Sequence, residues 1–153
     1  MLRPYVCVAC EKVITDQQTG GVASLIALFN KFVVTVPAGS APEIPRNAVA
    51  PKEWAVYSLW DTDPGDEQKE HILCTQILYP DQSPFADVNK TVMKMELKKR
   101  SQMIVRILGF PIGQPGFYTV RTWIEENRQM VFGPIEFKIE LEISKEEQAE
   151  KAT

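Results

Sequence analysis

Groups that carry out catalysis are scarce in this sequence. The 153 residues include one histidine, His71, and contain neither a Gly-x-Ser-x-Gly nucleophile elbow nor a glycine-rich phosphate loop. The glycines at 20–21 and within 113–116 fit turns instead. Because catalysis needs titratable groups that converge on one place, we predict that the chain is not an enzyme. A cryptic hydrolase, built on His71 and a nearby carboxylate, ranks behind two kinds of binding module.

Long apolar runs are also absent. The longest, Val22 to Phe29, is far below the ~20 residues that a helix needs to cross a bilayer. The N-terminal residues do not predict a signal peptide, because Pro4 and Glu11 leave too short an apolar segment after Arg3. Three cysteines, an odd number, fit a reducing compartment better than a disulfide framework. We therefore expect a cytoplasmic protein with no membrane partner.

Basic stripes are missing as well. The net charge is −3, and the densest basic run is Lys98-Lys99-Arg100. Since nucleic acids are normally bound by a basic surface, we predict no nucleic-acid partner. A chain of this length can bury roughly 68–70% of its unfolded surface without staples. We expect one domain over residues 1–143, followed by a flexible charged tail over 144–153.

The C-terminal part of the sequence has the clearest pattern. From Ile135 to Ile143, apolar residues alternate strictly with charged ones, as in a strand with one face in a core and one in water. Phe137 is central in this run and is predicted to be buried. Residues 117–124 alternate too, with one face formed by Tyr118, Val120, Thr122 and Ile124 and the other by Phe117, Thr119, Arg121 and Trp123. The polar turn between the two runs predicts a hairpin, with Asn127 in the left-handed conformation.

Six further segments have strand patterns, at residues 4–14, 22–36, 52–60, 71–79, 91–98 and 102–110. Residues 37–51 carry four prolines and are predicted to be a long loop. No run long enough for a crossover helix separates the strands. About eight strands, with turn signals near every ten residues, predict an all-β fold: an antiparallel Greek-key β-sandwich of the immunoglobulin-like type.

Two stretches resemble a family of small, uncharacterised bacterial β-sandwich proteins. One runs from Ser24 to Phe32 before a proline-containing loop, and the other is Pro115-Gly116-Phe117-Tyr118-Thr119-Val120. The family has a Gly-Lys-x-x-Ile-x-Gly-Val-Phe-Asp-like strand and a later Pro-Gly-x-Tyr-like segment. This chain departs from it at Ala27, where the family often has Gly, and at Asn30, where it often has Asp. The resemblance implies the fold and a bacterial origin, and no activity.

Four residues are candidate zinc ligands. Cys7-x-x-Cys10 and His71-x-x-Cys74 together supply three thiols and one imidazole, the ligand set of a structural zinc site. Each pair lies within a predicted strand, however, where residues three apart point to opposite faces. We therefore favour small buried cysteines and expect neither zinc nor any cofactor.

Acidic residues after the 52–60 strand are candidate calcium ligands. A calcium ion takes six to eight oxygens, and carboxylates are offered by Asp61, Asp63, Asp66 and Glu67, with Asp81 and Asp87 in a second loop. The loop lacks the glycine and the distal glutamate of a helix–loop–helix calcium site. A solvated loop is the favoured interpretation.

Edge strands give the functional prediction. The 22–36 segment has one charge, Lys31, and no proline, whereas the strand that starts at Thr91 carries several charges. Since unguarded edges accept another strand, we predict a non-catalytic protein-binding or assembly module, whose partner is another protein or a second copy. The alternative is a carbohydrate- or calcium-dependent binding domain. Trp54 and Trp60 share a strand face but lie roughly 20 Å apart, too far for one sugar, so we assign them to the core.

Overall fold

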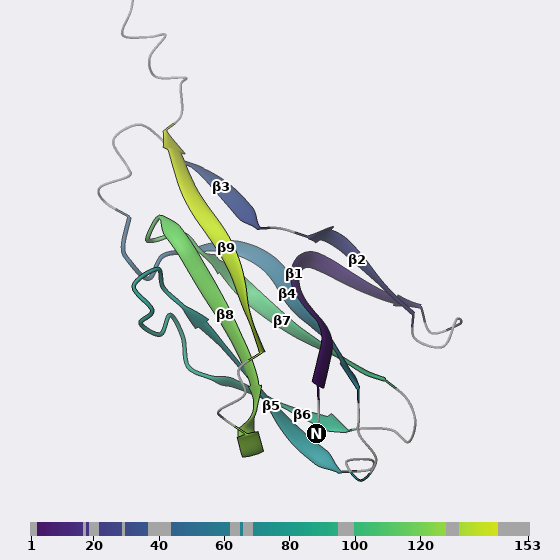
Figure 1. Cartoon of the computed structure of the whole chain (residues 1–153). Coiled ribbons are helices and arrows are strands. Elements are labelled where there is room, and N and C mark those ends of the chain that lie inside the picture. The colour runs from purple at the N-terminus through teal and green to yellow at the C-terminus, as the bar shows by residue number, and fades with distance from the viewer. Residues whose placement is uncertain are drawn as a thin grey trace, which may run out of the picture.

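A computed structural model describes residues 3–16, 18, 22–28, 30–36, 44–61, 65, 69–94, 100–127 and 132–143. These residues form an all-β structure (Figure 1). Its strands are β1 (Arg3–Asp16), β2 (Val22–Leu28), β3 (Lys31–Val36), β4 (Val49–Asp61), β5 (Glu70–Leu78), β6 (Asn89–Lys94), β7 (Ser101–Pro111), β8 (Gly116–Ile124) and β9 (Phe132–Ile143). Within the described ranges, no helix is long and apolar enough to span a bilayer. The expected tail at 144–153 lies outside them.

The strands form two sheets. The four-stranded sheet has the order β2-β1-β4-β7, and the five-stranded sheet has the order β3-β9-β8-β5-β6. Neighbouring strands are antiparallel except for β3 and β9, which are parallel. The chain passes from one sheet to the other between β2 and β3, between β3 and β4, between β4 and β5, between β6 and β7, and between β7 and β8.

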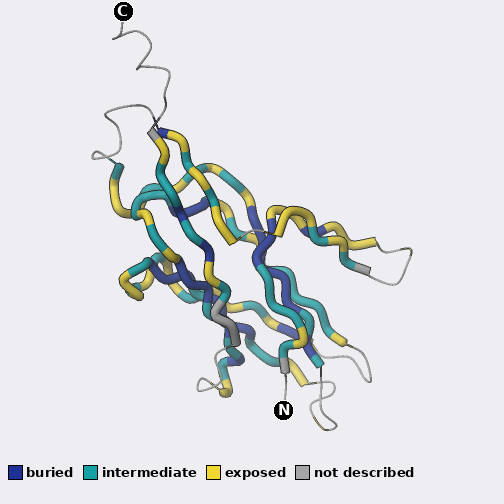
Figure 2. The backbone as a smooth tube through the Cα atoms, turned by 45° about the horizontal axis from the view of Figure 1, so that its top comes forward, coloured by how far each residue is buried: buried dark blue, intermediate teal, exposed yellow. Residues whose placement is uncertain are grey.

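The core lies between the sheets and is built by the predicted alternation. On β4, Trp54, Val56 and Trp60 belong to the main buried cluster, whereas Ala55 and Tyr57 belong to a second one. Figure 2 shows the buried stretches running through the middle strands of both sheets. Phe137 is fully buried, as predicted. Its ring centroid lies 5.5 Å from that of Trp54, 5.3 Å from Phe110 and 5.6 Å from Tyr118.

The second cluster lies on the outer side of the four-stranded sheet. Strand β1 pairs with β4 through residues 3–10 and with β2 through residues 10–16, so its second half leaves the sheet as a hairpin with β2 that projects from the molecule (Figure 1). One face of this hairpin, which includes Ala23 and Leu25, packs against Cys10 and Tyr57. The other face of the hairpin is exposed.

The segment predicted as one strand over residues 22–36 is two strands in different sheets. Ala27 has a φ of 53°, in the left-handed region, shortly before the break between β2 and β3. After the break, the Asn30 carbonyl accepts a hydrogen bond from the Lys138 amide at 2.8 Å, which starts the pairing of β3 with β9. This division produces the ninth strand. The prediction for Asn127 is wrong, because Glu125–Asn127 form a 3₁₀ turn and Asn127 has no positive φ.

Phe137→Ala should lower the free energy of unfolding by about 3–5 kcal/mol, because it removes a ring enclosed by three others. The matched control is Phe117→Ala on the neighbouring strand, where the ring is 55% exposed and faces Lys138. That change should cost less than about 1 kcal/mol. Urea titrations with equal midpoints for both variants would contradict the burial of Phe137.

Ala27→Gly should raise the free energy of unfolding by about 0.5–1 kcal/mol, because glycine adopts a positive φ without the strain that a Cβ brings. Ala23→Gly, in the same strand but with an ordinary φ and a packed side chain, should have the opposite sign. Thermal or urea unfolding of the pair measures both. A loss of stability in both variants would argue against the left-handed backbone at position 27.

Candidate functional site

Strand β2 forms one edge of the four-stranded sheet. Its sequence, VASLIAL, has neither a charge nor a proline. Ile26 is 43% exposed and Leu28 61% exposed, and Ile14 on the adjoining β1 is 45% exposed. Natural edge strands are usually blunted by charge, proline or a cover. Among the described sheet edges, β2 has neither of the first two.

The other three edges are guarded. On β3, the Lys31 ammonium lies 2.5 Å from the Glu140 carboxylate. On β6, Lys90 forms an ion pair with Glu125 and Lys94 is exposed. Strand β7 carries an exposed Arg106 and ends at a proline. An incoming strand at any of these edges meets a charge or a missing backbone donor.

A hollow of about 290 Å³ lies on the outer face of the five-stranded sheet. Strand register places its lining side chains together, because Cys74 is opposite Trp123 and Gln76 is opposite Arg121 across β5 and β8. On the other side of β5, Lys90 is opposite Cys74. The lining is completed by Val88 and Glu125. Directly opposed residues share a face of the sheet, so this group follows from the strand order.

The charges in the hollow are unequally matched. The Lys90 ammonium pairs with the Glu125 carboxylate. The Arg121 guanidinium donates from Nη2 to the Gln76 amide oxygen at 2.9 Å, and its buried Nε has no hydrogen-bond acceptor. Within the described part of the chain, no carboxylate forms an ion pair with Arg121. Its positive charge is therefore met by an amide dipole alone.

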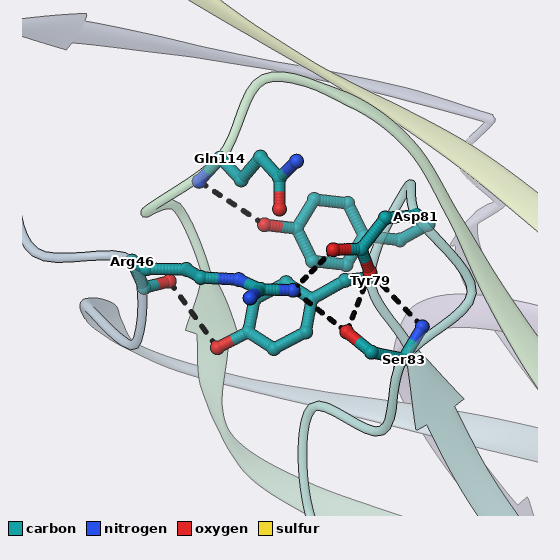
Figure 3. Close-up of polar contacts among 6 residues, drawn as sticks. Arg46, Tyr79, Asp81, Ser83 and Gln114 are labelled. Atoms are coloured by element: carbon teal, nitrogen blue, oxygen red, sulfur yellow. Dashed lines mark hydrogen bonds and ion pairs between the residues drawn. The ribbon is translucent and has the colours of Figure 1, made fainter.

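A polar cluster joins the segment before β4 to the loop between β5 and β6 (Figure 3). The Arg46 guanidinium lies 4.2 Å from the centre of the Tyr79 ring and donates from Nη2 to Asp81 at 2.5 Å and to Ser83 at 2.6 Å. The Ser83 hydroxyl and backbone N–H both donate to Asp81, at 2.5 and 2.9 Å. These hydrogen bonds, with the nearby Arg46 charge, hold the pKa of Asp81 below its ordinary value.

The candidate zinc ligands occupy separate places. Cys7 packs against the core between the sheets, Cys10 belongs to the cluster on the outer side of the four-stranded sheet, and Cys74 lines the hollow on the five-stranded sheet. The imidazole Nδ1 of His71 lies 3.9 Å from the Glu126 carboxylate. None of the three cysteines forms a disulfide, and burial raises the pKa of Cys7 and of Cys10. No three metal-binding side chains gather anywhere in the described residues.

The candidate calcium ligands are only partly described. Asp63, Asp66 and Glu67 lie outside the described residues. Asp61 accepts a hydrogen bond from Arg100 Nε at 2.8 Å. Asp81 belongs to the Arg46 cluster, and Asp87 lines a separate cavity of about 250 Å³ beside Thr75. Asp61 and Asp81 are thus each paired with an arginine.

The sequence alone did not assign Trp123 to a binding site. Trp54 and Trp60 are fully buried, as expected for core residues. Trp123 is partly exposed in the hollow. The alternation did place Arg121 and Trp123 on one face, and this was the available signal. The neighbouring β5 and β6 residues could not be added without the strand order.

Comparison with protein-family models and with curated proteins finds no match for this chain. The resemblance to small bacterial β-sandwich proteins therefore stays a prediction.

Asp81→Asn should destabilise the protein near neutral pH and have little effect in strong acid. The lowered pKa means that the carboxylate stabilises the folded state above the ordinary aspartate pKa of about 3.9 and loses this effect as the pH falls through the folded-state pKa. Urea titrations near neutral pH and at a pH of about 2 measure the difference. Asp87→Asn, in the same loop but outside the cluster, should cost less at neutral pH. Equal losses for Asp81→Asn at both pH values would contradict the role of its charge.

Proposed function

We propose that this chain is a non-catalytic assembly module that pairs with a second copy of itself through β2. The observation that carries the proposal is the contrast between β2, which has neither charge nor proline, and the three guarded edges. The unpaired backbone groups of such an edge are ready to accept a strand by main-chain hydrogen bonding. The exposed side chains of Ile14, Ile26 and Leu28 would lie within the added contact.

The hairpin itself gains from such pairing. Two-stranded hairpins are marginally stable in water, and three or more strands with a packed face are needed for independent stability. Beyond residue 10, β1 is paired with β2 and no longer with β4. Antiparallel pairing of β2 with its copy would make a four-stranded sheet from two hairpins. Such a contact is isologous and closes at a dimer.

We further propose that the architecture is a Greek-key sandwich of the immunoglobulin-like type. Its support is the order β1-β4-β7 facing β6-β5-β8-β9, together with the crossings between β4 and β5, between β6 and β7, and between β7 and β8. A second support is Tyr118, near the start of β8, whose hydroxyl accepts a hydrogen bond from the Gln114 backbone N–H at 3.2 Å. A tyrosine bonded to the backbone a few residues upstream at this corner is typical of such sandwiches. The β1–β2 hairpin and β3 are then additions to that plan.

Ile26→Lys should convert the dimer to a monomer, because it places a charge beside the pairing edge. Sedimentation velocity or light scattering at high micromolar concentration measures the mass. The matched control is Val92→Lys on β6, which introduces the same charge at an exposed valine of the guarded edge. That variant should remain a dimer.

Two results would contradict this proposal. A wild-type chain that is monomeric at high micromolar concentration would remove the self-association. A dimer that persists in Ile26→Lys but dissociates in Val92→Lys would show that the interface is formed by β6, at the edge of the five-stranded sheet. Circular dichroism of both variants checks that the fold is retained.

A further inference from the structure

We propose that the hollow on the outer face of the five-stranded sheet binds a small organic carboxylate, held by Arg121 and stacked on Trp123. This inference does not depend on the proposed function. The hollow lies on β5, β6 and β8, whereas the assembly edge is β2 in the other sheet. Either proposal can fail while the other stands.

The first reason is the unmet bonding capacity of Arg121. A guanidinium has five N–H donors in a fixed fork, and the described contacts of Arg121 consist of one hydrogen bond, from Nη2 to Gln76. Its Nε is buried without an acceptor. Buried polar groups in native proteins are nearly always bonded. A carboxylate is the group whose two oxygens match a guanidinium with parallel hydrogen bonds.

The second reason is the charge balance of the lining. Arg121 and Lys90 are cationic and Glu125 is anionic. The Lys90–Glu125 ion pair accounts for one charge of each sign, which leaves the charge of Arg121. One monoanion would balance it. Moreover, an ion pair with Arg121 would form in a hollow that is partly screened from water, where electrostatic attraction exceeds that at an open surface.

The third reason is the size and the apolar wall. The volume of about 290 Å³ is at the small end of ligand pockets, so the occupant is comparable to a single ring that bears its carboxylate. The Trp123 indole and the Val88 side chain supply the apolar part of the lining. Flat rings pack on indole by offset stacking or edge contact. A planar or branched apolar body next to the carboxylate therefore fits the site.

The test uses the three indole N–H signals in the nitrogen–proton correlation spectrum of the full chain. Trp54 and Trp60 are fully buried, and their Nε1 atoms donate to the Gly109 carbonyl at 3.1 Å and to the Ser58 hydroxyl at 2.8 Å. Trp123→Phe identifies the third signal by its loss. Titration with benzoate should shift the Trp123 signal with saturation and leave the other two in place. Benzamide has the same shape without the charge, and its affinity should be at least about tenfold lower than that of benzoate.

Arg121→Gln should weaken benzoate binding about tenfold or more, since it removes a charged fork. The matched control is Arg106→Gln, an exposed arginine of β7 outside the hollow, which changes the net charge equally and should leave the affinity unchanged. A carboxylate can also come from a protein side chain. A capped glutamate dipeptide titrated in the same way separates the sources, because Arg121-dependent binding of the peptide without binding of benzoate would assign the site to a protein carboxylate.

Three outcomes would overturn the proposal. They are equal shifts from benzoate and benzamide, unchanged benzoate affinity in Arg121→Gln, and no saturable shift of the Trp123 signal from either carboxylate. If Arg121→Gln does not fold, the comparison of benzoate with benzamide on the wild-type chain still decides the case.

Discussion

The two sheets are held face to face by aromatic rings that meet at Phe137. This residue of β9 contacts Trp54 and Phe110 from the four-stranded sheet and stacks on Tyr118 from its own. Burial of large rings is the strongest single source of stability in a sandwich of this size. Tyr118 also anchors the connection between β7 and β8 through its hydroxyl. The same packing therefore fixes both the separation of the sheets and one of the loops that cross between them. It does not involve the outer faces or the edges of the sheets.

Those outer surfaces differ between the two sheets. The four-stranded sheet covers part of its outer face with its own hairpin, at Cys10, Leu25 and Tyr57. The five-stranded sheet keeps a polar outer face on which Trp123 and Arg121 share a hollow. Hydrophobic side chains on the outside of the first sheet suit contact with another strand, and fixed charges beside an aromatic wall suit a small anion. Each surface follows from alternation along the strands, and the two surfaces lie in different sheets.

Much of the fold could be predicted from period-two patterns, and the arrangement of the strands could not. The alternation assigned the faces of β4, β8 and β9, and the structure agrees at Trp54, Tyr118 and Phe137. It gave no sign that residues 22–36 divide between two sheets, because the left-handed backbone at Ala27 carries no glycine to mark it. The hollow was missed for a related reason. Its residues come from three strands, and only the pairing of β6 and β8 with β5 brings Lys90 and Gln76 into one hollow with Arg121.

The parallel pairing of β3 with β9 has a consequence for how the chain is made. Lys31 lies beside Lys138 and Val36 beside Ile143. Strand β3 therefore cannot pair in its sheet until β9 has been synthesised. Contacts between such distant parts of a sequence slow folding, because the intervening chain must be ordered first. During synthesis on the ribosome, β3 would emerge with no partner for its backbone and with Phe32 and Val34 uncovered. The nascent chain would therefore have to be kept from aggregating until its C-terminal strand emerged.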